Sequence, residues 1–154
     1  MYNSNQRLII EHAYRKLQPF KGLEALVIPP KGWINTVRTA LKMSLRQLGN
    51  RLNISPQSVK EIENREASGS LTIKSLREAG LALNLKLVYG FIPIDGSIEK
   101  MIENRAFELA REIIDRTSQS MKLENQENKE ERLKKAIEMK AREIIDKMPK
   151  YLWD

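Results

Sequence analysis

The feature that most constrains this chain is a pair of helix-start signals at Ser44 and Ser55, separated by only ten residues. Ser44 is followed three residues later by Gln47, which is the spacing of a capping box around a helix N-terminus. Ser55 is followed by Pro56, and proline suits the first position of a helix because the N–H that it lacks is not needed there. Ten residues hold one short helix and a tight turn, so this stretch is predicted to form a helix-turn-helix.

The apolar residues of this stretch have the spacing needed to close a small core. At 100° per residue, the side of the second helix opposite that core carries Gln57, Glu61 and Asn64. Glu63 turns back toward the core, where a carboxylate needs a partner, and Arg38 on the preceding helix is the candidate for an ion pair. The expected core residues are Leu45, Leu48, Leu52, Ile54, Val59 and Ile62.

Hydrophobic periodicity predicts a mainly α-helical chain with one strand. Helices are expected at residues 6–18, with Ile9, Ala13 and Leu17 on one apolar stripe, and at 32–42, with Trp33 or Ile34, Val37 and Leu41 inward. Further helices are expected at 45–52, 56–65 and 73–83. Two longer helices are expected, one starting after Ser97 and one at 121–147. We divide the chain into an N-terminal helix and linker (1–30), a helix-turn-helix domain (31–84), a strand (85–96) and a C-terminal helical region (97–154).

The expected strand is Leu85–Ile94, LKLVYGFIPI, which is rich in β-branched and aromatic residues. One strand cannot form a stable sheet, because its hydrogen-bonding edges need a partner. The same strand of a second copy would supply one and would make a two-fold homodimer. The alternative is that it pairs with Leu23–Ile28 of the same chain.

The composition narrows the possible functions. The chain has no cysteine and one histidine, which excludes thiolate zinc sites, a cysteine nucleophile and histidine-rich metal sites. No cofactor or catalytic activity is expected. No apolar run reaches the roughly 18 residues that span a bilayer, and the polar start Met1–Gln6 is not a signal peptide, so a cytoplasmic protein without membrane contact is expected.

The charge is uneven along the chain. The net charge is +7, and residues 1–70 hold 11 Lys and Arg against 5 Asp and Glu, whereas residues 97–154 hold 13 of each. A basic excess of this kind favours a polyanionic partner. We therefore expect the first half of the chain to meet an anion and the second half to pack or to bind protein.

The residues from Arg38 to Leu83 resemble the Xre-type helix-turn-helix of phage repressors and antitoxins. In that family an arginine of the first helix pairs with a glutamate near the end of the recognition helix, which corresponds to Arg38 and Glu63. This chain departs from the family at Leu45, where a phosphate-contacting glutamine is frequent, and at Gly49, where alanine is preferred. The glycine allows close helix approach at a cost of about 1 kcal/mol in helix stability.

The resemblance implies that the second helix enters the major groove of double-stranded DNA. Gln57 is then placed to read adenine, and Glu61 to accept a hydrogen bond from cytosine. Arg46, Lys60 and Asn64 are better placed for phosphates, which set register but not sequence. The remaining expected DNA contacts are Ser44, Gln47, Ser55 and Ser58. The alternative is a solvated helix face, and Gln47 has a capping role that needs no DNA.

A wider resemblance covers most of the chain and points to the family called mobile mystery protein A. It is carried by the GWI of Gly32–Ile34, the EASGSLTIKSL of Glu66–Leu76 and the LVYGFIP of Leu87–Pro93. Members of that family resemble antitoxins encoded beside a protein with a Fic (AMP-transferring) domain. The helix followed by a strand also looks like the HipB antitoxin, whose strands pair across a dimer.

The resemblance gives the C-terminal region a role. Antitoxins of Fic proteins share a Ser or Thr, three residues, Glu, then Gly or Asn, and this chain carries Ser120, Glu124 and Asn125 in that pattern. It implies that Glu124 occupies a toxin arginine and so blocks the ATP γ-phosphate. The alternative is that Ser120 caps the last helix and Glu124 is a solvated first-turn acid.

These observations together predict a homodimeric, sequence-specific DNA-binding antitoxin that reads a palindromic operator, represses its own operon and inhibits a Fic-domain toxin. One rival is a stand-alone repressor without a toxin. The other is an enzyme acting on nucleic acid, for which the chain has neither a histidine cluster nor a recognisable carboxylate metal motif.

Overall fold

The computed structural model describes residues 3–118 and 126–154. Within these residues the secondary structure is helical, in agreement with the predicted class, and no β-strand is present. The contacts divide the chain into two compact units, one of Glu24–Gly90 and one of Met1–Leu23 together with Phe91–Asp154. The N-terminal helix, which was predicted to form a region of its own with the linker, therefore packs with the C-terminal region.

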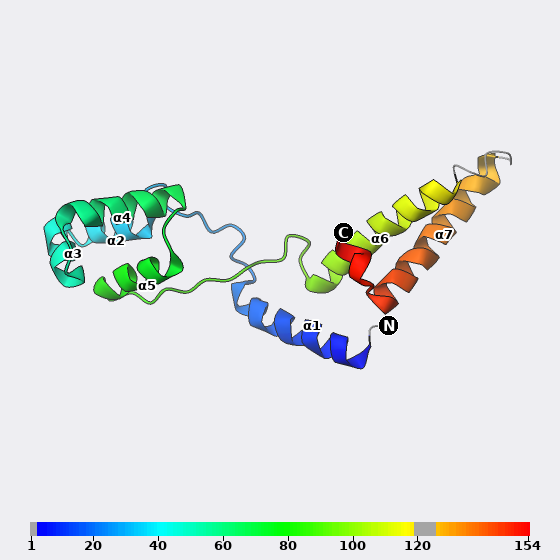
Figure 1. Ribbon diagram of the computed structural model, residues 1–154, viewed down its shortest axis with the longest axis horizontal. Helices are drawn as coiled ribbons and strands as arrows, with labels where there is room; N and C mark the ends of the chain where they lie inside the picture. Colours follow the sequence, from blue (N-terminus) through cyan, green and yellow to red (C-terminus); the bar gives the residue numbers. More distant parts are fainter. Residues whose placement is uncertain (1–2, 119–125) are drawn as a thin grey trace. The chain divides into compact units, whose positions relative to one another are not determined.

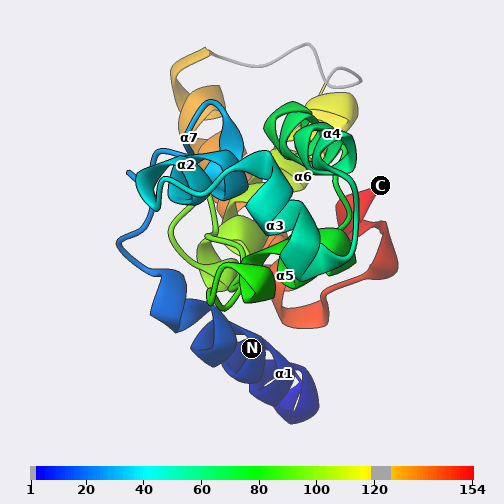
Figure 2. The ribbon, with the colours of Figure 1, turned by 90° about the vertical axis from the view of Figure 1, so that its left-hand side faces the viewer.

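The unit Glu24–Gly90 consists of four helices, α2 (Gly32–Ala40), α3 (Leu45–Leu52), α4 (Pro56–Ser68) and α5 (Ile73–Ala82) (Figures 1 and 2). Each of α3, α4 and α5 follows a serine or threonine whose hydroxyl accepts a hydrogen bond from the backbone N–H three residues on. Helix α4 extends beyond its predicted end at Arg65. It ends where Gly69 adopts a left-handed conformation with φ of 77°.

The core of this unit contains all six residues predicted for it. Leu48 and Val59 are fully buried, and the other four pack against them half-buried. On α2, Ile34 is buried, while Trp33 is 43% exposed. The prediction that Leu41 points inward is wrong, since this residue is 57% exposed. The reason is that α2 ends at Ala40, so that Leu41 no longer follows the helical stripe.

The turn between α3 and α4 is tight. Asn53 takes a left-handed conformation with φ of 56°, and the N–H of Ile54 donates to the carbonyl oxygen of Gly49 at 2.9 Å. A Cβ atom on Gly49 would lie 2.7 Å from the carbonyl oxygen of Ile54. Gly49 therefore allows the turn to fold against α3, as the sequence analysis proposed for this position.

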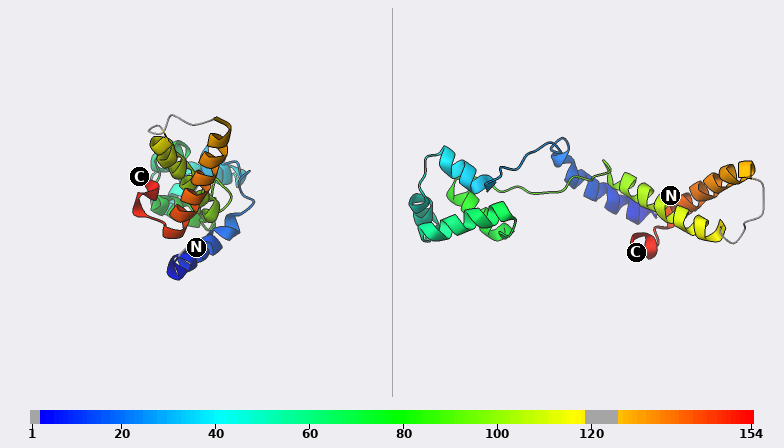
Figure 3. Two further views of the ribbon diagram at one scale, coloured as in Figure 1. Left: turned by 90° about the vertical axis from the view of Figure 1, so that its right-hand side faces the viewer. Right: turned by 90° about the horizontal axis from the view of Figure 1, so that it is seen from above.

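The second unit, which we call the helical unit, contains α1 (Ser4–Leu17), α6 (Ile98–Ser118) and α7 (Gln126–Lys147), with short 3-10 helices η1 (Gln18–Phe20) and η2 (Lys150–Trp153). Helices α6 and α7 run antiparallel, side by side (Figures 1 and 3). Their contact is built on small residues, and its buried members are Ala106, Ala110, Ala141, Ile102 and Ile144, joined by Ile10 of α1 and Leu152 of η2.

Two features of this unit differ from expectation. On the apolar stripe predicted for α1, Ala13 and Leu17 are half-buried, but Ile9 is 54% exposed and its neighbour Ile10 is buried in its place. Helix η2 was not predicted, and Arg105 of α6 holds it. The Nε atom of Arg105 donates to the carbonyl oxygen of Leu152 at 2.7 Å, and Nη2 donates to that of Asp154 at 2.8 Å.

The predicted strand Leu85–Ile94 has no regular secondary structure in this chain. No backbone–backbone hydrogen bond joins residues 86–92 to another described part of the chain. The alternative partner Leu23–Ile28 is not a strand either. A strand is defined by a hydrogen-bonded neighbour, and no described segment of the single chain supplies one.

We predict that Gly49→Ala destabilises the Glu24–Gly90 unit by about 1–3 kcal/mol, because the new methyl group meets backbone atoms that cannot move aside. Gly80→Ala is the matched control. Its Cβ would have no neighbour closer than 3.5 Å, so helix propensity should make it neutral or slightly stabilising. Urea unfolding followed by Trp33 fluorescence in a Trp153→Phe background reports this unit. Equal stability of the two variants would contradict the close approach.

Candidate nucleic-acid interface

A buried ion pair joins α2 to α4. Arg38 is 9% exposed and Glu63 is 2% exposed. Nε of Arg38 donates to Oε1 of Glu63 at 2.5 Å, and Nη2 donates to Oε2 at 3.2 Å. The expected pair is therefore present. Nη1 of Arg38 donates to the carbonyl oxygen of Met43 at 2.8 Å, and Nδ2 of Asn35 donates to Oε2 of Glu63 at 2.8 Å.

The pKa of Glu63 lies below its ordinary value of 4.5. Burial acts to raise this pKa, because desolvation disfavours the charged form. The hydrogen bonds from Arg38 and Asn35 and the charges of Arg38 and Lys60 act in the other direction and outweigh burial. Glu63 is therefore a carboxylate at neutral pH and keeps the side of α4 that bears it turned toward α2.

Two residues of this contact were missed by the sequence analysis, Asn35 and Glu66. The two carboxylate oxygens of Glu66 accept hydrogen bonds from the backbone N–H groups of Trp33, at 2.8 Å, and Ile34, at 3.0 Å. For Asn35 a signal was present, because it lies three residues before Arg38 and therefore on the same helix face. The position of Glu66, three residues after Glu63, places it on the same face of α4 but does not identify its backbone partners on α2.

The opposite side of α4 faces solvent. Gln57, Lys60, Glu61 and Asn64 are all exposed, as the angular argument predicts. Ser58 is half-buried, and its hydroxyl lies 2.9 Å from that of Ser55, which caps the helix. Four of the residues expected to meet DNA, namely Gln57, Lys60, Glu61 and Asn64, thus share one exposed face of α4.

The N-terminus of α3 lies at the start of the same pair of helices and forms a complete capping box. The N–H of Gln47 donates to Oγ of Ser44 at 3.1 Å, and the N–H of Ser44 donates to Oε1 of Gln47 at 2.8 Å. The side chain of Gln47 therefore has the capping role proposed as its alternative. Its Nε2 and the exposed side chain of Arg46 remain as donors for an outside ligand.

The unit Glu24–Gly90 presents a positive surface. It holds ten lysines and arginines against five glutamates, and every basic residue except Arg38 is exposed. Two of the glutamates, Glu63 and Glu66, are engaged with α2. The charge available to an outside ligand is therefore more strongly positive than the composition alone implies.

The other candidate residues, Ser120, Glu124 and Asn125, lie outside the described residues, between the end of α6 at Ser118 and the start of α7 at Gln126.

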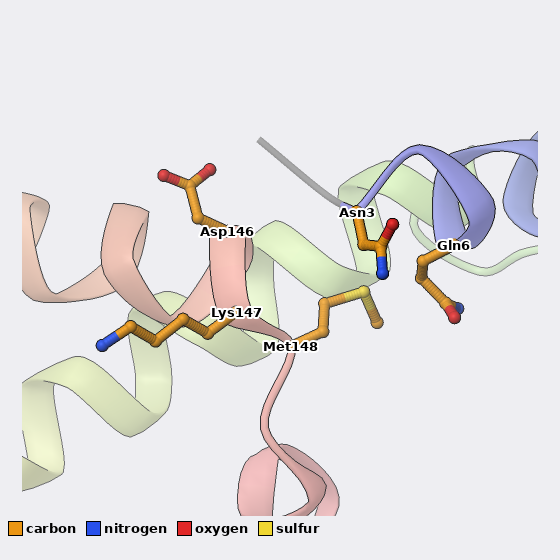
Figure 4. A pocket seen from close by; sticks show the side chains of 5 residues that line it. All are labelled: Asn3, Gln6, Asp146, Lys147 and Met148. Carbon is orange, nitrogen blue, oxygen red and sulfur yellow. The ribbon is translucent and has the colours of Figure 1, made fainter.

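A hollow of about 290 Å³ in the helical unit gathers no set of convergent charges. Asn3, Gln6 and Met148 border it, while the charged ends of Asp146 and Lys147 extend away from it (Figure 4). The Nζ atom of Lys147 instead lies 2.8 Å from Glu143. Residues 3–118 and 126–154 contain no cluster of three or more histidine, cysteine or acidic residues suited to a metal ion. No helix among them has the length and apolar character needed to cross a membrane.

Comparison of the chain with protein-family models, with curated proteins and with solved structures finds no match.

We predict that Glu63→Gln lowers the free energy of unfolding of this unit by about 3–5 kcal/mol at pH 7, because it leaves the Arg38 charge buried without its counter-ion. The loss should shrink on acidification. Because the pKa of Glu63 is lower in the folded protein than its ordinary value of 4.5, the carboxylate contributes fully to the free energy of unfolding above about pH 4.5. This contribution is lost as the pH falls through the pKa of Glu63 in the folded state.

The matched control is Glu61→Gln, two residues away on the exposed face, which should change stability by no more than about 0.5 kcal/mol. Urea unfolding at pH 7 and at pH 3, followed by Trp33 fluorescence, separates the two variants. A pH-independent effect of Glu63→Gln would contradict the role of the carboxylate charge.

Proposed function

We propose that this chain binds double-stranded DNA, with α3 and α4 acting as an Xre-type helix-turn-helix and α4 as the recognition helix. The observation that carries the proposal is the division of α4 into two sides. Glu63 and Val59 hold one side in the fold, while polar side chains that match base edges and phosphates occupy the exposed side. The surrounding positive surface supplies the attraction to phosphate.

The roles of the side chains follow from their chemistry. Gln57 offers an amide that pairs with adenine in the major groove, and Glu61 accepts from the amino group of cytosine. An exposed carboxylate on an otherwise basic surface repels phosphate, so Glu61 is better suited to a base than to the backbone. Arg46, Lys60 and Asn64 contact phosphates, with Ser44, Ser55, Ser58 and Gln47 at the two helix starts beside them.

A homodimer belongs to this proposal. Residues 85–94 expose several large apolar side chains, with Val88 70%, Phe91 79% and Ile94 100% exposed. A second copy pairing along this segment would bury them and satisfy its backbone groups. Two recognition helices related by a two-fold axis read a palindrome whose half-sites lie about 34 Å apart.

Inhibition of a Fic-domain toxin is the second part of the proposal. It is supported by the motif at Ser120, Glu124 and Asn125 and by the family resemblance of the chain. A glutamate held by an arginine of the toxin takes the place of a phosphate anion. A repressor without a toxin partner is the alternative, and it shares the whole DNA-binding half.

We predict that selection from random duplexes yields a palindromic site, and that Gln57→Ala weakens the preference at one base of each half-site by about 1–3 kcal/mol. Arg46→Ala should weaken specific and random duplexes alike and lower the slope of log affinity against log salt by about 0.9. Fluorescence anisotropy at several salt concentrations measures both. Lys134→Ala, which removes an exposed charge of the helical unit, is the control and should change neither. Unchanged affinity and base preference in Gln57→Ala would contradict the docking.

For the toxin, we predict that the product of the neighbouring gene co-purifies with this chain and transfers AMP only when Glu124 is replaced. Glu124→Gln removes the charge that occupies the toxin arginine. Glu130→Gln, an exposed acid of α7, is the control and should leave transfer silenced. Co-expression, pull-down and an AMP-transfer assay decide the matter. DNA binding without any co-purified partner would leave a plain repressor.

A further inference from the structure

The N-terminus of α2 is closed by a residue that is distant in sequence. Helix α2 follows Pro29, Pro30 and Lys31, and no side chain at its N-cap position accepts a hydrogen bond from its first turn. The N–H groups of Trp33 and Ile34 instead donate to the two oxygens of Glu66, which lies 33 and 32 residues away on α4. A carboxylate is the anion that a helix N-terminus favours, because the N–H groups and the helix dipole both point toward it.

Gly32 makes room for this carboxylate. A Cβ atom at this position would lie 2.7 Å from both the carboxyl carbon and Oε2 of Glu66. Its φ of 81° is also in the left-handed region, where glycine is favoured. The backbone is thus shaped so that the Glu66 side chain reaches α2 without obstruction.

Glu66 and Glu63 together connect one side of α4 to two separate points of α2. Glu63 bonds to Asn35 and Arg38 in the body of α2, and Glu66 bonds to the N-terminus of α2. One point of attachment leaves a helix free to turn about that point. Two points, one helical turn apart, set both its rotation about its own axis and its tilt.

We infer that Glu66 is a positioning residue for base recognition, one that acts by holding α4 in the rotation that presents Gln57 and Glu61. The inference rests on the DNA binding proposed above. Glu66 itself is half-buried against α2 and is on the side of α4 away from the bases. Its loss should therefore disturb the choice of sequence more than the attraction to phosphate.

The test compares Glu66→Gln with the wild-type full-length protein on the selected duplex and on a random duplex. We expect the ratio of the two affinities to fall roughly tenfold, the scale of one well-made base contact, with little change on random DNA. Gly32→Ala places a methyl group against the Glu66 carboxylate from the α2 side of the contact and should also lower the ratio of the two affinities. Ala79→Gly destabilises the same unit from α5 and should leave the ratio unchanged, since lost stability lowers the active fraction equally for both duplexes.

A second measurement needs no DNA. Amide hydrogen exchange at Trp33 and Ile34 should accelerate in Glu66→Gln relative to the other amides of α2, and should not do so in Ala79→Gly. An unchanged affinity ratio in both Glu66→Gln and Gly32→Ala, or unchanged exchange at the two amides, would overturn the positioning role alone. A wild-type protein that binds no duplex at all would overturn the proposed function and this inference together.

Discussion

Arg38 and Glu63 form a charged pair inside a unit of four short helices, and the arrangement of that unit depends on it. Moving two charges out of water costs several kcal/mol for each ion, so such a pair persists only when its remaining donors and acceptors are also satisfied. Here Asn35 and the carbonyl oxygen of Met43 complete the set. Because the charges must meet, the side of α4 that bears Glu63 faces α2, and its polar side is directed outward.

Much of this unit could be predicted from sequence because its determinants are local. The caps at Ser44 and Ser55, the apolar spacing of α3 and α4 and the inward turn of Glu63 all follow from residues within one or two helical turns of each other. The contact of Glu66 with the start of α2 could not be predicted in this way. Its donors are backbone N–H groups, which every residue except proline carries, so the sequence does not distinguish them.

The errors in the helical unit and along residues 85–94 have different physical origins. In α1 the apolar residues Leu8, Ile9 and Ile10 are adjacent, and periodicity alone does not decide which of them faces a core built by distant helices. The high β propensity of residues 85–94 is real, but propensity describes a residue's fit to a sheet and supplies no neighbouring strand. The sequence therefore indicates the high β propensity of residues 85–94, but it does not indicate that they form no strand in the single chain.

The unit Glu24–Gly90 interrupts the helical unit between Leu23 and Phe91, and this has a consequence for the order of folding. Ile10 packs in one core with Ile102 and Ile144, which a ribosome adds long after it. Helix α1 is therefore synthesised before the helices that it packs against, and its apolar residues are in water at that stage. The unit Glu24–Gly90 is continuous in sequence, so all of its helices are present before α6 is made. Once that unit has folded, it replaces a long free loop by a compact body, which lowers the entropy cost of bringing the two parts of the helical unit together.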